Sequence, residues 1–315
     1  RTPQHRTPPE NTVSTEPRYL AVDLGKTSCR VRLFDADGVI AEESGPGAPG
    51  IADLDGVALS AHAIRALFLR LPATERAALA GVGIGAAGVE AAGIIARDLV
   101  AEVRGFTGAP VALINDALAA HAGAFDGGAG VILIIGTGAI AYAVADDGAT
   151  RQIDGWGPWL GDEGSGRWIG QEGLAAALRD VDGRGSATAL TARARTLVGD
   201  LAAMPAWVSA EGNPARRLGR FTPDVLDAAG HGDVIARDIV TRACTALVAT
   251  ARAAGSPEIA VWGGVAAHPY FSAELTATFA QAGITIIPSR GTALDGSALI
   301  ITRTDLGYEE RIIRG

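Results

Sequence analysis

Alternating apolar and polar residues predict three short strands near the start of the chain, at 19–23, 30–34 and 39–42. An Asp-Gly pair at 37–38 provides the tight turn before the third strand, because glycine adopts positive φ at little cost. Apolar residues then recur at helical spacing and predict a helix at 51–71. Further strands are expected at 81–85, 111–115, 130–135, 140–145, 258–262 and 285–287. Helices are expected in the stretch that ends near 104, from about 117, at 167–179 and at 271–282, and a last helix begins near 292. The composition between 179 and 254 is also helical.

The same pattern begins twice. Strand, turn, strand and turn at 130–148 repeat those at 19–38, and alternating helices and strands complete each half. This repetition predicts a duplicated α/β architecture with a cleft between the halves. We divide the chain into a flexible, proline-rich tail at 1–17, a first domain at 18–125 and a second at 126–315, whose last helix could pack back on the first domain.

Composition narrows the class of protein. Hydrophobic residues make up 48% and charged residues 20%, a globular balance, and the net charge of -8 has the wrong sign for a nucleic-acid or membrane-surface binder. The most apolar stretch, 130–144, is shorter than the roughly 20 residues that span a bilayer. Two cysteines and five scattered histidines exclude a disulfide scaffold and a usual zinc motif. We expect a cytoplasmic protein without a signal peptide, whose partners are small molecules.

Two glycine-containing turns are candidates for phosphate binding. In the first, the backbone N–H groups of Gly25, Lys26 and Thr27 could cradle phosphate oxygens, Lys26 could add a point charge, and Asp23 could hold Mg²⁺ through water. An ordinary hairpin turn would have the same sequence. The matching turn of the second half is Gly136-Thr137-Gly138, and two such turns facing each other would hold a triphosphate from both sides.

Glycines at 263 and 264 follow an apolar strand. Without side chains, Gly263 and Gly264 could lie against an adenine or ribose. A plain turn between strand and helix is the alternative.

The segment 154–170 combines glycines with tryptophans and carboxylates. Aromatic faces pack on the C–H surface of a sugar, and carboxylates accept its hydroxyl hydrogen bonds, so this composition is typical of a sugar site. In the alternative interpretation Trp156 and Trp159 anchor the core, while Asp162 and Glu163 begin a helix at the positive end of its dipole.

Asn115 and Asp116 end an apolar strand and begin a helix. A carboxylate there could take the proton from an attacking hydroxyl during phosphoryl transfer. Asparagine and aspartate are also preferred helix caps, so a capping role is the alternative.

Taken in order, AVDLGKTSCRVRLF, GVGIGAAG, LINDALAAHAGAF, GVILIIGTGAIAYAV, GWGPWLGDEGSGRWIG, VWGGVA and GTALDGSALI resemble the N-acetylglucosamine kinase and BadF-type ATPase family from about 19 to 299. The resemblance implies the actin-like ATPase fold, two RNase H-like domains that close over ATP. By the same resemblance, Asp116 is the catalytic base and Thr27 and Thr137 contact phosphate. It also assigns sugar-binding positions to Gly155, Trp156, Gly157 and Asp162 and the adenosine-side position to Gly263. We add Asn115 as a candidate for substrate binding.

Four positions depart from the family pattern. Lys26 replaces a glycine of the first phosphate motif, which affects nucleotide affinity or the choice of phosphate donor. Ala139-Ile140 replaces a polar Ser-Asn pair near the sugar. Asp154 replaces a glycine and adds a carboxylate near the expected sugar, which would favour a free amine.

The resulting hypothesis is an amino-sugar kinase that uses ATP and Mg²⁺ to phosphorylate the 6-hydroxyl of N-acetylglucosamine or glucosamine. By analogy with the family, we also expect the protein to form a homodimer. Two alternatives stay open: an ATPase that activates a partner enzyme, which would need a shared iron–sulfur cluster ligated by cysteines, and a sugar or nucleotide sensor without catalysis.

Overall fold

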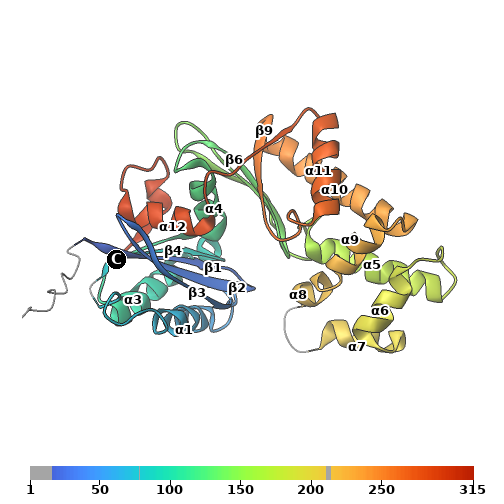
Figure 1. The fold of residues 1–315 in the computed structure, drawn as a ribbon, viewed down its shortest axis with the longest axis horizontal. Coiled ribbons are helices and arrows are strands. Elements are labelled where there is room, and N and C mark those ends of the chain that lie inside the picture. Colours follow the sequence, from blue (N-terminus) through green and yellow to red (C-terminus); the bar gives the residue numbers. More distant parts are fainter. Residues whose placement is uncertain (1–15, 78, 211–213) are drawn as a thin grey trace, which may run out of the picture.

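The computed structural model describes residues 16–77, 79–210 and 214–315, so most of the expected tail lies outside the described residues. Two lobes stand side by side, each built around one β-sheet (Figure 1). The first sheet contains β1 (Arg18–Leu24), β2 (Ser28–Asp35), β3 (Gly38–Pro46), β4 (Leu79–Ala86), β5 (Val111–Asn115) and β11 (Ile313–Arg314). The second contains β6 (Gly130–Ile135), β7 (Ala139–Val144), β8 (Thr150–Asp154), β9 (Glu258–Trp262) and β10 (Thr285–Ile287).

The two sheets share one strand order. The first reads β3-β2-β1-β4-β5, with β11 beyond β5, and the second reads β8-β7-β6-β9-β10. In each sheet the first three strands are antiparallel and the next two run parallel to the central strand. The predicted duplication is therefore confirmed at the level of topology. Parallel strands bring their carboxyl ends to one edge, where ligands of α/β sheets bind.

Helices cover the sheets. Those of the first lobe are α1 (Gly56–Phe68), α2 (Val89–Ala92), η1 (Gly93–Ile95), α3 (Ala96–Thr107), α4 (Asp116–Phe125) and α12 (Ala293–Thr302). The second half of the chain adds α5 (Gly166–Val181), α6 (Leu190–Val198), η2 (Leu201–Ala203), α7 (Met204–Ser209), α8 (Pro214–Gly219), α9 (Thr222–Gly230), α10 (Val234–Ala254) and α11 (Pro269–Gln281). A short turn, η3 (Glu309–Arg311), precedes β11.

Two predicted helices needed correction. The helix expected at 51–71 begins only at Gly56, because the Asp53 carboxylate accepts the N–H of Gly50 at 2.8 Å and closes a loop there. The helix expected before 104 is broken into α2, η1 and α3, since Gly93 takes φ of 53°. Both interruptions come from local backbone geometry that apolar spacing does not report.

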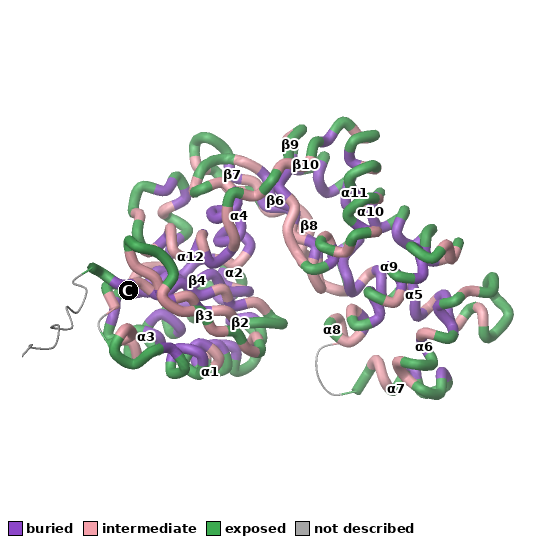
Figure 2. Tube along the Cα trace, in the orientation of Figure 1, coloured by how far each residue is buried: buried purple, intermediate pink, exposed green. Residues whose placement is uncertain are grey.

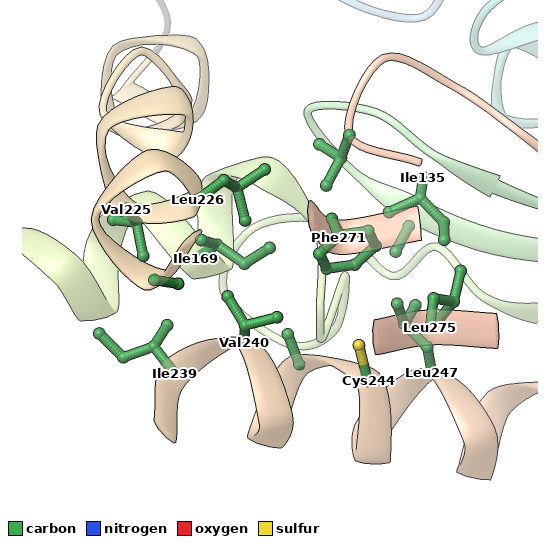
Figure 3. Packing of buried hydrophobic residues seen from close by; sticks show 14 of the residues in the cluster. Ile135, Ile169, Val225, Leu226, Ile239, Val240, Cys244, Leu247, Phe271 and Leu275 are labelled. Carbon is green, nitrogen blue, oxygen red and sulfur yellow. The ribbon is translucent and has the colours of Figure 1, made fainter. Parts of the chain in front are cut away.

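Buried residues lie in the interior of both lobes (Figure 2), and most of them are apolar. In the second lobe, Phe271 packs among residues of β6, α5 and α10, and Cys244 lies in the same apolar cluster (Figure 3). In the first lobe, Cys29 of β2 belongs to the core beneath α1 and α3. A third cluster surrounds α4, between the sheets, and includes Tyr142 of β7.

The end of the chain returns to the first lobe (Figure 1). Helix α12 lies against α4, where Cβ atoms at Gly123 and Gly296 would each approach a backbone oxygen to 1.8 Å, so only glycine permits this packing. The buried Ser297 hydroxyl donates to Val22 O at 2.7 Å and accepts from Gly85 N at 3.1 Å. It thereby joins α12 to β1 and β4.

Side-chain hydrogen bonds also cross between the lobes. His121 Nε2 of α4 lies 2.9 Å from Gly130 O of β6. The buried Tyr142 hydroxyl of β7 donates to Glu90 Oε1 of α2 at 3.0 Å. Among the described helices, none is both long and apolar enough to cross a bilayer.

Candidate active site

Asn115 and Asp116 lie where β5 ends and α4 begins. The Asn115 side chain accepts the N–H of Ala117 at 2.9 Å, so it caps the helix. Asp116 is the first helical residue, and its carboxylate also lies 2.9 Å from the N–H of Ala117. A Cβ at Gly85 would lie 2.5 Å from the Cβ of Ala119, which shows that a glycine in β4 is required for α4 to approach so closely. The cap and the candidate base are thus adjacent residues.

The electrostatic surroundings of Asp116 suit a general base. Burial, and secondly the nearby charge of Asp23, raise the pKa of Asp116 to about 6. The N–H of Ala117 and the charge of Lys26 act in the opposite direction. A base is most effective when its pKa lies near the working pH. The sequence-predicted residues Asp23, Lys26 and Asp116 therefore form one electrostatic group.

The turn between β1 and β2 has a fixed backbone. Gly25 N donates to Ser28 O at 2.9 Å, and Ala48 N donates to Gly25 O at 3.3 Å. Among the described residues, none accepts a hydrogen bond from the N–H of Lys26 or Thr27. The binding of phosphate oxygens by these two N–H groups stays a prediction.

Asp23 and Lys26 differ in their partners. Asp23 Oδ2 forms an ion pair with Arg30 at 2.6 Å, which leaves Oδ1 for a hydrated cation. Lys26 is exposed, and within the part of the chain that is described it has no ion pair. A Cβ at Gly50 would lie 3.5 Å from Lys26 Cε and 3.3 Å from Asp53 Oδ2, so the lysine stem follows the 50–53 loop.

The turn of the second lobe is tied to the start of α5. Gly136 N donates to Gly138 O at 2.9 Å, and the carbonyls of Gly136 and Thr137 accept from the N–H groups of Gly166 and Arg167 at 2.8 and 3.0 Å. These bonds fix the turn against the start of α5.

Gly263 lies beside the same turn. It has φ of 118°, and a Cβ there would come within 2.3 Å of Ile135 O, which also accepts the N–H of Val265 at 3.1 Å. Gly264 follows and is exposed. The structure therefore brings the predicted adenosine-side glycines to the predicted phosphate turn.

The sugar-loop candidate, residues 154–163, is shaped by Asp154. Asp154 has φ of 60°, and its two carboxylate oxygens accept the N–H groups of Asp162 and Glu163 at 2.9 and 3.3 Å. These backbone bonds use the carboxylate that the sequence assigned to the sugar. Asp154 therefore acts within the loop in this structure.

Asp162 occupies the centre of the sugar loop. It is buried, and a Cβ at Gly138 would lie 3.0 Å from its carboxylate, so the loop and the phosphate turn touch at this point. Burial raises the pKa of Asp162, while the N–H groups of Ala139 and Gly157 lower it. Gly155 and Gly157 both have positive φ, which bends the loop around it.

The tryptophans of the sugar loop are on the surface. Trp156 and Trp159 are 73% and 74% exposed. The interpretation in which they anchor the core is therefore wrong. Aromatic faces in this position are accessible to a ligand.

The candidate residues form two half-sites. Asp23, Gly25, Lys26, Thr27, Asn115 and Asp116 belong to the first lobe, and Gly136 to Gly138, the 154–163 loop and Gly263-Gly264 belong to the second. Cavities of about 530 Å³ and 340 Å³ lie elsewhere, between α1 and α3 and between α4 and α12. Among the described residues, no hydrogen bond or ion pair joins the two half-sites directly.

Two residues at the half-sites were missed by the sequence reasoning. Ser297 bonds to Val22 of β1, the strand that carries Asp23, and to Gly85 of β4, and Arg167 is buried behind the sugar loop. The available signal for Arg167 was a basic residue within the glycine-rich segment GDEGSGRWIG. Ser297 lies in the segment GTALDGSALI, but its role was not predictable because its partners are more than 200 residues away.

Comparisons with known proteins agree with this geometry. The BadF/BadG/BcrA/BcrD ATPase family matches residues 20–285. A curated N-acetylmuramic acid/N-acetylglucosamine kinase from Clostridium acetobutylicum is 34% identical over 109 residues, which are 35% of this chain and 35% of that protein. The match thus spans about a third of that relative.

Solved structures cover much more of the chain. A protein from Chromobacterium violaceum, provisionally described as an N-acetylglucosamine kinase, has a TM-score of 0.78 and 29% identity over 91% of this chain and 99% of its own. One from Porphyromonas gingivalis, described in the same way, has a TM-score of 0.76 and 16% identity, with 91% and 99% covered. A ROK family glucokinase from Streptomyces griseus, solved with glucose and AMPPNP, has a TM-score of 0.57 and 19% identity, with 89% and 98% covered. The predicted fold class is confirmed.

Proposed function

Because the chain belongs to the BadF/BadG/BcrA/BcrD ATPase family, we propose that it is an ATP-dependent kinase that phosphorylates the 6-hydroxyl of N-acetylglucosamine or glucosamine. The observation that carries the proposal is Asp116, a carboxylate at the carboxyl edge of the first sheet whose pKa is about 6. The choice of sugar is supported by the similar structure from Chromobacterium violaceum, because its description names N-acetylglucosamine.

Each half-site has a distinct task in this proposal. Asp116 accepts the proton of the sugar hydroxyl as its oxygen attacks the γ-phosphorus of ATP and ADP leaves. The N–H groups of Lys26 and Thr27 and the turn at Thr137 hold the phosphates, while the sugar loop presents Asp162 to the acceptor. Gly263 lies toward the adenosine.

Magnesium fits the residues as a hydrated ion. Asp23 keeps Oδ1 for it, and in the described ranges no cluster of three or more metal-binding side chains forms an all-protein cage. Mg²⁺ commonly binds through one or two carboxylates, water and substrate phosphates. When bound with ATP, it would neutralise charge that develops on the transferring phosphoryl group.

The two cysteines support the kinase over an electron-transferring ATPase. Cys29 and Cys244 are buried in the cores of different lobes, and burial raises the pKa of each thiol to about 12. Iron–sulfur clusters are ligated by thiolates, which these environments disfavour. Iron analysis of anaerobically purified protein tests this point, since stoichiometric iron would support the activator instead.

Sugar-dependent ADP release is the decisive experiment. The protein is assayed with Mg²⁺-ATP and N-acetylglucosamine, glucosamine, N-acetylmannosamine, N-acetylmuramic acid, glucose or no sugar, and products are identified by mass and by NMR of the phosphorylated position. Asp116→Asn is the test variant. Asp126→Asn is the matched control, because Asp126 is exposed at the other end of α4 with φ of 53°, a conformation that asparagine tolerates.

The proposal expects ADP release that requires an amino sugar, a product heavier by one phosphoryl group at O6, and activity lost only in Asp116→Asn. Phosphorylation at another position would refute the 6-hydroxyl assignment. ADP release without sugar would point to the ATPase activator, and sugar binding without ADP formation would point to a sensor.

A further inference from the structure

Arg167 is a buried cation behind the sugar loop. Its side chain lies near the N-terminus of α5, and the residue is only 5% exposed. Nη2 donates to Gly161 O at 2.7 Å and Nη1 donates to Gln171 Oε1 at 3.1 Å. Its backbone N–H donates to Thr137 O at 3.0 Å. One residue therefore contacts the sugar loop through its side chain and the phosphate turn through its backbone.

The charges of three nearby carboxylates favour a charged guanidinium at this buried position. Burial lowers the pKa of Arg167, and the charges of Asp162, Asp154 and Glu163 oppose that change. Within the described chain none of them comes within ion-pair distance of Arg167. Within the sugar loop, the Arg167 side chain donates instead to the carbonyl of Gly161, the residue immediately before Asp162. The arginine thus acts on the backbone that carries the carboxylates.

We propose that Arg167 is a positioning residue that holds the 154–163 loop in the shape that presents Asp162 to the sugar, while its backbone fixes the loop relative to the phosphate turn. The inference deepens the proposed function, because it assigns control of sugar affinity to a residue outside the set that would touch substrate. Replacing the side chain removes the hydrogen bond to Gly161 but leaves the backbone bond to Thr137 in place. Sugar binding should therefore suffer while nucleotide binding does not.

Arg167→Gln is the main variant. A hydrogen bond from a charged donor corresponds to about a 10- to 100-fold change in an equilibrium constant. We expect the KM for N-acetylglucosamine to rise by about that factor, with the KM for ATP changed less than about threefold. Arg167→Lys keeps the charge and should restore part of the sugar affinity. Arg179→Gln, an exposed arginine on the same helix, is the matched control.

Hydrogen exchange measured by mass spectrometry tests the positioning role without any substrate. The N–H of Asp162 donates to Asp154 Oδ1 at 2.9 Å, and the N–H of Gly161 donates to Gly157 O at 3.0 Å. Both amides should exchange at least about tenfold faster in Arg167→Gln, while β4 in the first lobe exchanges as in the wild type.

The outcomes separate this inference from the proposed function. If the wild type phosphorylates no sugar, the kinase proposal fails, but faster loop exchange in Arg167→Gln still supports the positioning role. Exchange equal to that of Arg179→Gln would overturn it, and so would equal increases in the KM values for sugar and ATP. If Arg167→Gln does not fold, Arg167→Lys decides by the same exchange and KM measurements, with a smaller change expected in both.

Discussion

Replacing Asp116 by asparagine is expected to stabilise the protein while it removes turnover. Folding raises the pKa of Asp116 from 3.8 to about 6, chiefly by burial and secondly by the charge of Asp23. A difference of about two pKa units corresponds to about 3 kcal/mol where Asp116 is ionised in both states. Water at this partly exposed side chain reduces the gain, so we expect about 1 to 3 kcal/mol. Asparagine is nearly the same size and can still accept the N–H of Ala117.

The stabilisation by Asp116→Asn should increase as the pH rises. A carboxyl whose pKa rises on folding is protonated in both states well below pH 3.8, so it does not destabilise the fold there. Its cost grows as the pH rises through the interval between 3.8 and about 6 and is complete above that interval. The advantage of Asp116→Asn at pH 4.5 should therefore be about a third of its value at pH 7.5.

Urea denaturation at the two pH values measures this difference. Circular dichroism is the suitable signal, because all five tryptophans lie after residue 150 and report mainly on the second half of the chain. Asp126→Asn controls for the loss of one acidic side chain, because Asp126 directly follows the last residue of α4. At pH 7.5 the turnover of Asp116→Asn should fall at least about 100-fold. The electrostatic reasoning is refuted if Asp116→Asn is less stable than the wild type at pH 7.5, or if its advantage is equal at both pH values.

Three further predictions use other contacts. Lys26→Met should raise the KM for ATP about tenfold, because an exposed ammonium without an ion pair is lost; initial rates test this, and an unchanged KM contradicts phosphate binding by Lys26. Ser297→Ala should lower the free energy of unfolding by about 1 to 3 kcal/mol, because two buried hydrogen bonds disappear; equal urea midpoints would disprove it. N-acetylglucosamine should protect Trp156 and Trp159 from acrylamide quenching of fluorescence, and quenching that no sugar concentration alters would place the sugar elsewhere.

Strand positions in this chain follow closely from local apolar runs. β5, β9 and β10 occupy the residues that the sequence predicts, because each is a short apolar run bounded by polar residues or turns. The two-residue strand β11 was not predicted, since it exists only by pairing with Leu113 and Ala112 of β5. Local patterns thus locate the sheets, while their edges depend on distant segments.

In the candidate site, too, some features follow from the local sequence and others depend on distant residues. The two turns and the Asn115-Asp116 junction are visible in sequence because glycine and capping residues determine backbone conformation locally. The ion pair of Asp23 with Arg30 and the backbone bonds of Asp154 were not predicted, because they depend on which side chains face each other after folding. Residue types indicated which groups could act, and the structure separates those that shape the site from those that are free to bind.

The last segment of the chain controls the geometry of the first half-site. Ser297 of α12 joins the strands β1 and β4, whose ends lie beside Asp23 and Asp116, and Asp295 of the same helix contacts Arg32 of β2 at 2.5 Å. Gly296 lets α12 pack directly on α4, the helix that begins with Asp116. The half-site that carries the candidate base is therefore complete only after α12 has crossed back from the second lobe. Duplicating the fold alone would not give this arrangement, since it requires a connection from one copy to the other.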